Sequence, residues 1–167
     1  MGTKKHRQNA PRHLKVAILT VSSTRTLEND ESGHWISKTA AKEGHRVVAH
    51  SVAPDDAEAI KNSVCRAIND HSPDIMIITG GTGIAKKDVT IEAVRPMFKK
   101  ELTAFGMVVS QLSFEQIDSA AILSRSAGGI IGKTAVFCIP GSKNACKLIC
   151  ASIIFPEAGH IVKHILE

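Results

Sequence analysis

The sequence predicts an α/β domain built on a parallel β-sheet. Short, nearly continuous apolar runs alternate along the chain with segments of helical periodicity. Apolar runs without polar gaps are typical of strands buried on both faces, and the intervening segments are long enough to connect parallel strands. A length of 167 residues is that of one domain with a single core.

The first half of the chain indicates the order β-α-β-α-β. Strands are expected at residues 14–21, 45–53 and 75–78, each an apolar run. Helices are expected between them, at residues 32–43 and 57–70, because apolar positions recur there every three to four residues. Each strand–helix–strand connection is expected to be right-handed.

The second half is less regular. A helix is expected at residues 90–100, where Pro96 should kink or shorten it. A further helical stripe covers residues 102–117 and is followed by an ambiguous stretch. The final helical region is expected at residues 143–166, with an interruption at Pro156.

Two strands, residues 122–131 and 133–139, are expected to meet at a tight turn at Gly132 and Lys133. The stretch 127–134 also differs from the P-loop pattern at only one position, with Ala127 in place of the first glycine. A P-loop follows a strand and begins a helix, whereas Lys133 begins a strand here. The hairpin is therefore the better interpretation.

Composition argues against several classes of protein. A net charge of +5 with one Trp and no Tyr offers no aromatic platform for nucleic acid. The sequence contains no run of about 18 apolar residues, so no membrane span is predicted. Residues 1–13 are expected to be a flexible basic tail, and they lack the apolar segment of a secretory signal. One domain is expected at residues 14–167. The four cysteines form no C-x-x-C pair, so reduced thiols and a cytoplasmic location are expected.

The central strand leads directly into a glycine-rich loop, Thr79-Gly80-Gly81-Thr82-Gly83. Glycines allow backbone N–H groups to approach a ligand closely, and such groups arranged as a nest bind anions such as phosphate. In open parallel sheets, ligands bind beyond the carboxyl ends of the strands, which is where this loop falls. The alternative is a plain strand-to-helix turn.

Three carboxylates, Asp30, Asp55 and Asp88, follow strands and are expected on the same rim of the sheet. Several acids beside a glycine nest suit Mg²⁺ together with a phosphate. For Asp55 and Asp88 the alternative is the N-cap of the next helix. Arg125 could pair with a phosphate through two hydrogen bonds, or form a surface ion pair instead.

Five segments occur together in the order and spacing of a known family. They are Thr79–Gly83, Lys87–Glu92, Phe105-Gly106, Leu123–Arg125 and Pro140–Ser142. With them the chain resembles the MoaB/MogA family of molybdenum cofactor biosynthesis proteins over residues 14–166. It resembles the MoaB branch of that family more closely.

The resemblance implies a three-layer α/β/α sandwich with a mostly parallel sheet. It implies binding of molybdopterin and its adenylylation with Mg-ATP, with release of pyrophosphate. It also implies a homotrimer or homohexamer that works with other proteins of the pathway. The family's catalytic residues fall on Asp55 and Asp88, which are also the expected Mg²⁺ ligands. Expected substrate-binding residues are Ser22, Thr79, Gly80, Gly81, Thr82, Gly83, Ser124, Arg125, Pro140, Gly141 and Ser142.

Two positions depart from the family pattern. Ser23 stands where the family commonly has the Asp of V-S-D-T-R, and Met107 stands where it commonly has the Glu of G-F-G-E. Each change removes a carboxylate from near the expected cleft. The alternative to an enzyme is therefore a binding or scaffolding protein that holds molybdopterin without turnover. A nucleotide-binding sensor of the same fold is a third hypothesis.

Overall fold

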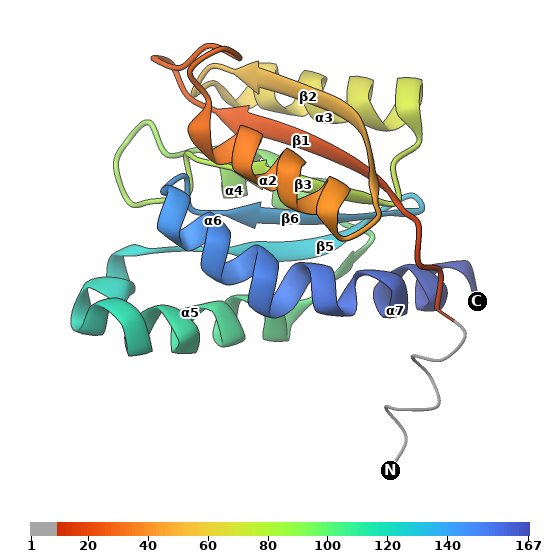
Figure 1. Cartoon of the computed structure of the whole chain (residues 1–167). Coiled ribbons are helices and arrows are strands. Elements are labelled where there is room, and N and C mark those ends of the chain that lie inside the picture. Colours follow the sequence, from red (N-terminus) through yellow and green to blue (C-terminus); the bar gives the residue numbers. More distant parts are fainter. Residues whose placement is uncertain (1–9) are drawn as a thin grey trace.

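The structure, a computed structural model, describes residues 10–167 and contains one six-stranded sheet in the order β2-β1-β3-β6-β5-β4 (Figure 1). The first four strands in this order run parallel, whereas β5 and β4 are antiparallel to their neighbours. The prediction of a mostly parallel sheet is confirmed. The strands are β1 (Lys15–Val21), β2 (Arg46–Ala53), β3 (Ile75–Thr79), β4 (Lys100–Glu101), β5 (Ala127–Ile131) and β6 (Thr134–Ile139).

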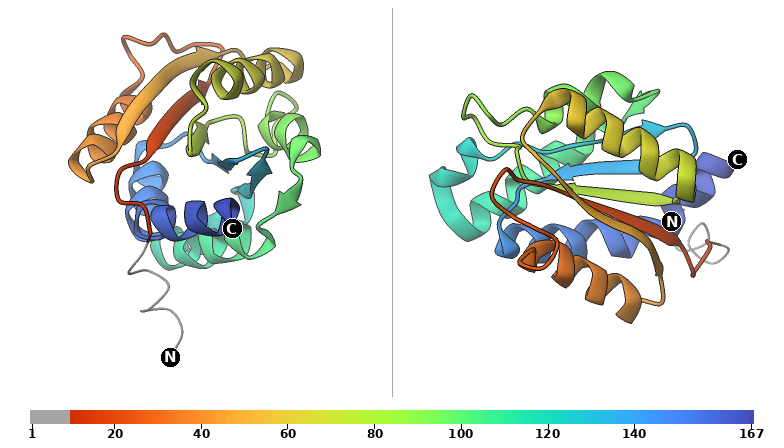
Figure 2. Two further views of the ribbon diagram at one scale, coloured as in Figure 1. Left: turned by 90° about the vertical axis from the view of Figure 1, so that its right-hand side faces the viewer. Right: turned by 90° about the horizontal axis from the view of Figure 1, so that it is seen from above.

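Helices cover both faces of the sheet and complete a three-layer α/β/α sandwich, as predicted. One face packs against α2, α5, α6 and α7, and the other against α3 and α4. Seen from above in Figure 2, α2 and α3 lie on opposite sides of the strands. The α-helices are α2 (Glu31–Lys42), α3 (Ala57–His71), α4 (Thr90–Val94), α5 (Thr103–Ile117), α6 (Lys143–Ile149) and α7 (Phe155–Leu166).

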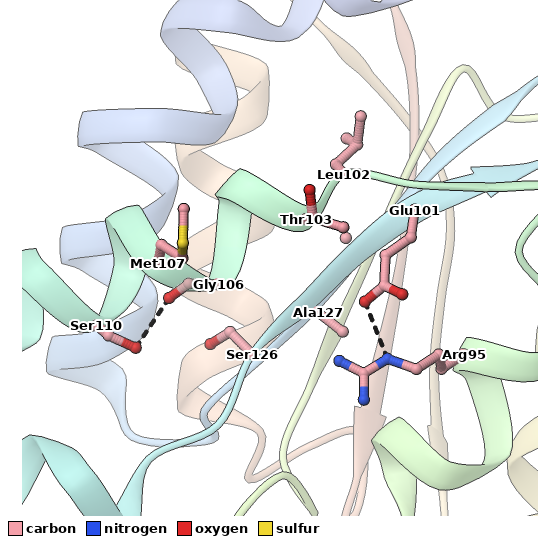
Figure 3. A pocket seen from close by; sticks show the side chains of 10 residues that line it. Arg95, Glu101, Leu102, Thr103, Gly106, Met107, Ser110, Ser126 and Ala127 are labelled. Carbon is pink, nitrogen blue, oxygen red and sulfur yellow. Dashed lines mark hydrogen bonds and ion pairs between the residues drawn. The ribbon is translucent and has the colours of Figure 1, made fainter.

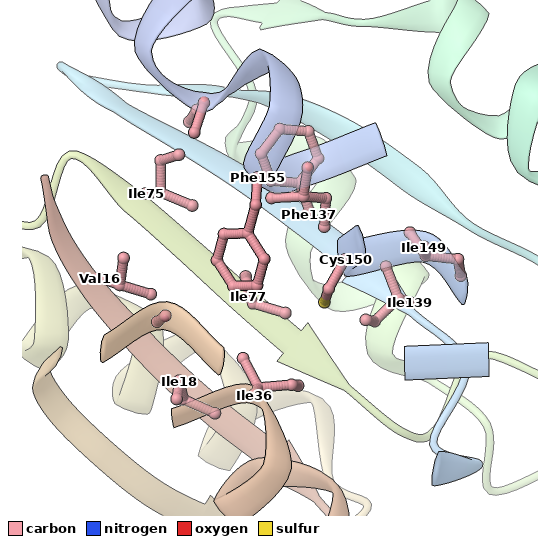
Figure 4. Close-up of a cluster of buried hydrophobic side chains, with 14 of the residues drawn as sticks. Val16, Ile18, Ile36, Ile75, Ile77, Phe137, Ile139, Ile149, Cys150 and Phe155 are labelled. Atoms are coloured by element: carbon pink, nitrogen blue, oxygen red, sulfur yellow. The ribbon is translucent and has the colours of Figure 1, made fainter. Parts of the chain in front are cut away.

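The central strand β3 explains why its sequence has no polar gap. All five of its residues are buried, with Ile75 and Ile77 facing one cluster of apolar side chains and Met76 and Ile78 facing the other. Figure 4 shows the first cluster, in which Ile77 lies close to side chains from the helical layer. The sheet is therefore buried on both faces, as parallel sheets in α/β proteins are.

The helix expected at residues 90–100 is shorter than predicted. The α-helix α4 ends at Val94, and Pro96 lies in a 3₁₀ turn, η1 (Arg95–Met97). Proline has no N–H to continue the α-helical hydrogen bonds. The chain then becomes extended, and Lys100 pairs with Ile130 in the short edge strand β4, which the sequence pattern missed.

The ambiguous stretch after α5 forms a 3₁₀ segment, η2 (Asp118–Leu123), so the strand expected from residue 122 begins only at Ala127. The predicted hairpin between β5 and β6 is confirmed, because Ile131 pairs with Thr134 across a two-residue turn. Gly132 has a φ of +59° in that turn, a conformation that glycine adopts without strain.

Pro156 does not interrupt the last helical region. Residues Lys143–Leu166 form one continuous helical run of 24 residues, with a π-helical segment, η3 (Cys150–Ile154), between α6 and α7. The Phe155 amide donates to the Cys150 carbonyl in this segment. Pro156 lies in the first turn of α7, where the missing N–H is tolerated.

This helical run is the one stretch within residues 10–167 whose length and composition would allow it to cross a membrane. Ile149, Ile154 and Val162 of the run are buried against the sheet in the core. The core helix of a soluble protein meets the same length and composition criteria.

Of the predicted tail, residues 1–9 lie outside the described part of the chain. His13, at its end, hydrogen-bonds through Nδ1 to the Gly44 carbonyl at 2.9 Å. The folded domain thus makes contacts with the chain immediately before β1.

Candidate functional site

The loops that follow β1, β3 and β6 meet at one edge of the sheet, as the sequence predicted for Gly80. The Gly80 amide donates to the Ile139 carbonyl at 3.0 Å, and a Cβ on Gly80 would collide with the Val21 carbonyl oxygen. A Cβ on Gly141 would lie 3.0 Å from the Gly80 Cα. Gly80 and Gly81 have φ values of +101° and +62°. Glycine is therefore required here by both close approach and conformation.

Hydrogen bonds from α4 and β3 fix the shape of this glycine loop. The Thr90 hydroxyl donates to the Gly80 carbonyl at 2.8 Å, and the Thr90 amide donates to the Gly81 carbonyl at 3.0 Å. The Thr79 hydroxyl donates to the Pro140 carbonyl at 3.1 Å. Since Thr79 and Thr82 are both buried, the side chains of these two predicted binding residues serve the fold, and the loop can reach a ligand mainly through its backbone.

Asp55 is turned toward the loop after β1 and does not cap a helix. Its Oδ2 accepts hydrogen bonds from the Ser23 amide at 2.8 Å and the Ser23 hydroxyl at 2.7 Å. The Asp55 amide in turn donates to the Ser23 Oγ at 3.1 Å. The N-cap of α3 is Asp56, whose side chain accepts from the Ala59 amide. The capping alternative for Asp55 is therefore wrong.

Asp88 is likewise not a helix cap. Its Oδ2 accepts a hydrogen bond from the Ala85 amide at 2.9 Å, inside the loop that follows the glycines. The N-cap position of α4 is Val89, which provides no capping side chain. Both aspartates thus use Oδ2 to hold a loop, and within the described residues no protein group donates to their Oδ1 atoms.

The donor set suits a magnesium ion shared with a substrate. The Asp55 Oδ1 would lie 3.4 Å from a Cβ placed on Gly81, so it faces the glycine loop. Residues 10–167 contain no group of three or more His, Cys, Asp or Glu side chains arranged to hold a metal. Mg²⁺ in nucleotide sites is commonly bound by one or two carboxylates together with water and phosphate oxygens. Asp55 and Asp88 would provide those carboxylates.

The remaining predicted binding residues, Ser22 and Pro140–Ser142, also lie in loops at this edge. The Ser22 hydroxyl accepts from the Thr24 and Arg25 amides at 3.3 and 3.2 Å, which folds the first loop back on itself. Arg25 donates to the Gly141 carbonyl at 3.4 Å. Ser142 caps the helical run that begins at Lys143, so the positive end of its dipole faces these loops. Such a helix start favours an anion.

Arg125 forms the ion pair that was the alternative to phosphate binding, and it also makes backbone contacts that the sequence did not reveal. Its guanidinium group donates to the carbonyls of Thr82, Gly83 and Asp88, at 3.0, 3.0 and 3.4 Å. It also forms two hydrogen bonds with the carboxylate of Glu92, at 2.5 and 3.2 Å. The Glu92 carboxylate raises the pKa of Arg125, and Arg125 lowers the pKa of Glu92.

Ser124, the neighbour of Arg125, lines a separate depression with Phe114 and Ile122. Its amide donates to the Ala121 carbonyl at 3.0 Å, which ends the 3₁₀ segment η2. In the described structure no hydrogen bond joins the Ser124 side chain to the glycine loop, and its expected role in substrate binding stays a prediction.

Asp30 is the third carboxylate expected on the rim, and the structure places it in the interior instead. Its side chain is fully buried, and Oδ2 accepts from the Thr20 hydroxyl at 2.5 Å and from His50 Nε2 at 2.8 Å. Oδ1 accepts from the Gly33 amide at 3.0 Å, so Asp30 caps α2. Asp30 therefore supports the loop after β1 from behind and is not available to a metal.

Met107 lies in a pocket away from the two aspartates. The pocket has a volume of about 350 Å³ and is lined by residues of β4, α5 and β5, together with Arg95 (Figure 3). Neither Asp55, Asp88 nor any residue of the glycine loop lines it. Of the two departures from the family pattern, only Ser23 touches a predicted catalytic residue.

Comparisons with known proteins agree with this architecture. Residues 17–160 match the family model described as a probable molybdopterin binding domain. Molybdenum cofactor biosynthesis protein B of Bacillus subtilis is 43% identical over 166 residues, covering 99% of this chain and 98% of the relative. A crystal structure of Molybdenum cofactor biosynthesis protein B matches with a TM-score of 0.90 and 39% identity, covering 94% of this chain and 98% of the other.

A second solved structure, the tungsten cofactor synthesizing protein MoaB from Pyrococcus furiosus, matches with a TM-score of 0.85 and 37% identity. The match covers 95% of this chain and 100% of that one. These similarities extend over nearly the whole domain and include the strands and loops that form the candidate site. The chain therefore belongs to the MoaB/MogA family of molybdenum cofactor biosynthesis proteins.

Proposed function

We propose that this protein acts in molybdenum cofactor biosynthesis by binding molybdopterin and transferring an adenylyl group to it from ATP. The observation that carries the proposal is the arrangement of Asp55 and Asp88 around the glycine loop. Each aspartate has one oxygen held by a backbone amide and the other without a described protein donor. Two fixed carboxylates beside backbone N–H groups suit a pair of phosphorylated substrates and a metal ion.

In the proposed reaction, an oxygen of the terminal phosphate of molybdopterin attacks the α-phosphorus of ATP. The bond between the α-phosphorus and the bridging oxygen to the β-phosphate breaks, and pyrophosphate leaves with the electron pair. A bound Mg²⁺ would neutralise the charge that develops on the phosphate oxygens. The protein mainly holds two polyanions in line, a contribution that comes from positioning and electrostatic stabilisation.

Named residues have separate parts in this proposal. Asp55 and Asp88 would hold the metal, and the Gly80–Gly83 backbone would contact phosphate. The segment Pro140–Ser142 and Ser22 lie at the same edge of the sheet, where the start of the helical run at Lys143 favours an anion. Ser23, which stands where the family commonly has an acid, donates to Asp55 and keeps it turned toward the glycine loop.

Self-association into a homotrimer or homohexamer is part of the proposal, as are a cytoplasmic location and exchange of substrate with other proteins of the pathway. Support for self-association comes from the apolar surface of α5 and η2. Its large apolar side chains are exposed to an extent unusual for a monomer surface. They are Met107, Val108, Phe114, Ile117, Ile122 and Leu123.

The test is incubation of the purified protein with molybdopterin, ATP and Mg²⁺, with detection of pyrophosphate and adenylylated pterin. We expect Asp88→Ala to lower turnover at least about 100-fold while molybdopterin binding is retained. Asp70→Ala is the matched control, because Asp70 is an exposed aspartate on α3 outside the site.

The outcomes separate the alternatives. Unchanged turnover in Asp88→Ala would show that the site assignment is wrong. Tight binding of molybdopterin by the unmodified protein without product would favour the non-catalytic binding or scaffolding function. Binding of ATP without affinity for the pterin would indicate a nucleotide sensor.

A further inference from the structure

Arg125 joins a segment far along the chain to the loop that carries Asp88. Its Nε donates to the carbonyls of Thr82 and Gly83, and its Nη2 donates to the carbonyl of Asp88. Three backbone acceptors of one loop therefore depend on one guanidinium group. Within residues 10–167, no other side chain forms hydrogen bonds to as many backbone atoms of this loop.

Glu92 fixes the guanidinium group in that orientation. Its two carboxylate oxygens take hydrogen bonds from Nη1 and Nη2 of Arg125, so every nitrogen of the guanidinium group has an acceptor. A planar group with donors in a fixed fork can make all these contacts at once, whereas a lysine ammonium cannot. Glu92 lies on α4, two residues after Thr90, which itself holds Gly80 and Gly81.

We infer that Arg125 is a positioning residue that holds the 82–88 loop, and with it Asp88, in the arrangement needed for reaction. Glu92 is the second member of this device, because it holds Arg125 in place. The part of the inference that concerns turnover rests on the proposed function. The part that concerns the loop stands on contacts within the protein.

The inference differs in a measurable way from the hypothesis that Arg125 binds a substrate phosphate. If Arg125 positions the loop, removing the charge of Glu92 loosens Arg125 and weakens the function. If Arg125 is a phosphate ligand, the same change frees its donors and tightens binding of the anion. The two hypotheses therefore predict opposite effects for Glu92→Gln.

A second arginine–glutamate pair provides a matched control. Arg95 donates through Nε to Glu101 at 2.9 Å, as Figure 3 shows. The two arginine side chains are 50% and 35% exposed in the Arg95 and Arg125 pairs, respectively. In the described part of the chain, Arg95 bonds to no backbone carbonyl of the loop. Loss of this pair should therefore report the effect of losing a surface ion pair alone.

The experiment compares four variants of the full chain, Arg125→Lys, Glu92→Gln, Arg95→Lys and Glu101→Gln. Amide hydrogen exchange of the 82–88 loop is measured without substrates, followed by kcat and KM for ATP. In Arg125→Lys and Glu92→Gln we expect exchange of the Ala85 and Asp88 amides to rise about 10-fold, which corresponds to one or two lost hydrogen bonds.

In the same two variants kcat should fall about 10-fold while KM for ATP changes less than about 3-fold, because the loop is misplaced without loss of a ligand contact. The two control variants should match the unmodified protein in every readout. Unchanged loop exchange in Arg125→Lys would overturn the inference, and so would tighter ATP binding in Glu92→Gln. If the unmodified protein forms no product, the proposed function fails, while the exchange measurement still decides the role of Arg125.

Discussion

Replacing the buried Asp30 by alanine is expected to destabilise the fold more than the loss of any carboxylate in an exposed loop. Asp30 is fully buried and accepts hydrogen bonds from Thr20, His50 and Gly33. Removing one partner of a buried charged network leaves the other groups unpaired, at a cost of about 3–5 kcal/mol. Asp30→Asn retains a carbonyl oxygen and the shape of the side chain, so we expect a smaller loss of about 1–3 kcal/mol.

The pH dependence of these differences gives a second check. Burial alone would raise the pKa of Asp30, but the hydrogen bonds from Thr20, Gly33 and His50 hold that pKa below its ordinary value of 3.8. A carboxyl group whose pKa is lower in the folded state stabilises the fold at pH values above its unfolded pKa. The stabilisation is lost as the pH falls through the folded value. The difference in unfolding free energy between the unmodified protein and Asp30→Asn should therefore shrink below about pH 4.

Urea unfolding at pH 7 and at several pH values down to 3 measures both effects. A loss in Asp30→Ala smaller than about 1 kcal/mol would refute the reasoning, since it would place the network in the range of exposed pairs. A difference for Asp30→Asn that stays constant or grows at low pH would show that the carboxylate is not the stabilised form.

Two further predictions concern single side chains. Ser23→Ala removes the hydroxyl donor to the Asp55 Oδ2 but retains the amide donor, so kcat should fall about 10-fold with little change in melting temperature. Steady-state assays at saturating ATP measure kcat, and an unchanged kcat would contradict this prediction. Cys65 is exposed, whereas the other three cysteines are buried and burial raises the pKa of their thiols. Iodoacetamide should therefore label one thiol in the native protein and four after unfolding. Labelling of more than one thiol in the native protein would contradict this assignment.

The sequence pattern located the glycine loop better than it assigned the side chains around it. The apolar run of β3 and the three glycines after it were sufficient to place this loop at the edge of the sheet, because both signals are local. Whether Asp55 caps α3 could not be decided from sequence. The contact that turns Asp55 away from the helix comes from Ser23, which lies 32 positions away in the chain.

The predictions that failed depended on tertiary contacts. Asp30 follows β1 as a rim residue would, but His50 on the neighbouring strand draws it into the interior. The edge strand β4 is too short for a periodic pattern, and only its pairing with β5 defines it. The sequence predicted an interruption at Pro156 because residue types do not reveal the π-helical segment that precedes it.

The helical run from Lys143 to Leu166 has a practical consequence for handling the protein. Its first residues lie beside the glycine loop, and its 24 residues extend about 36 Å at a rise of 1.5 Å per residue. An affinity tag or a surface anchor attached after Glu167 would therefore lie at the end of the molecule opposite the candidate site. Immobilisation through that end leaves the candidate site open to solution, which suits measurements of pterin and nucleotide binding on a sensor surface.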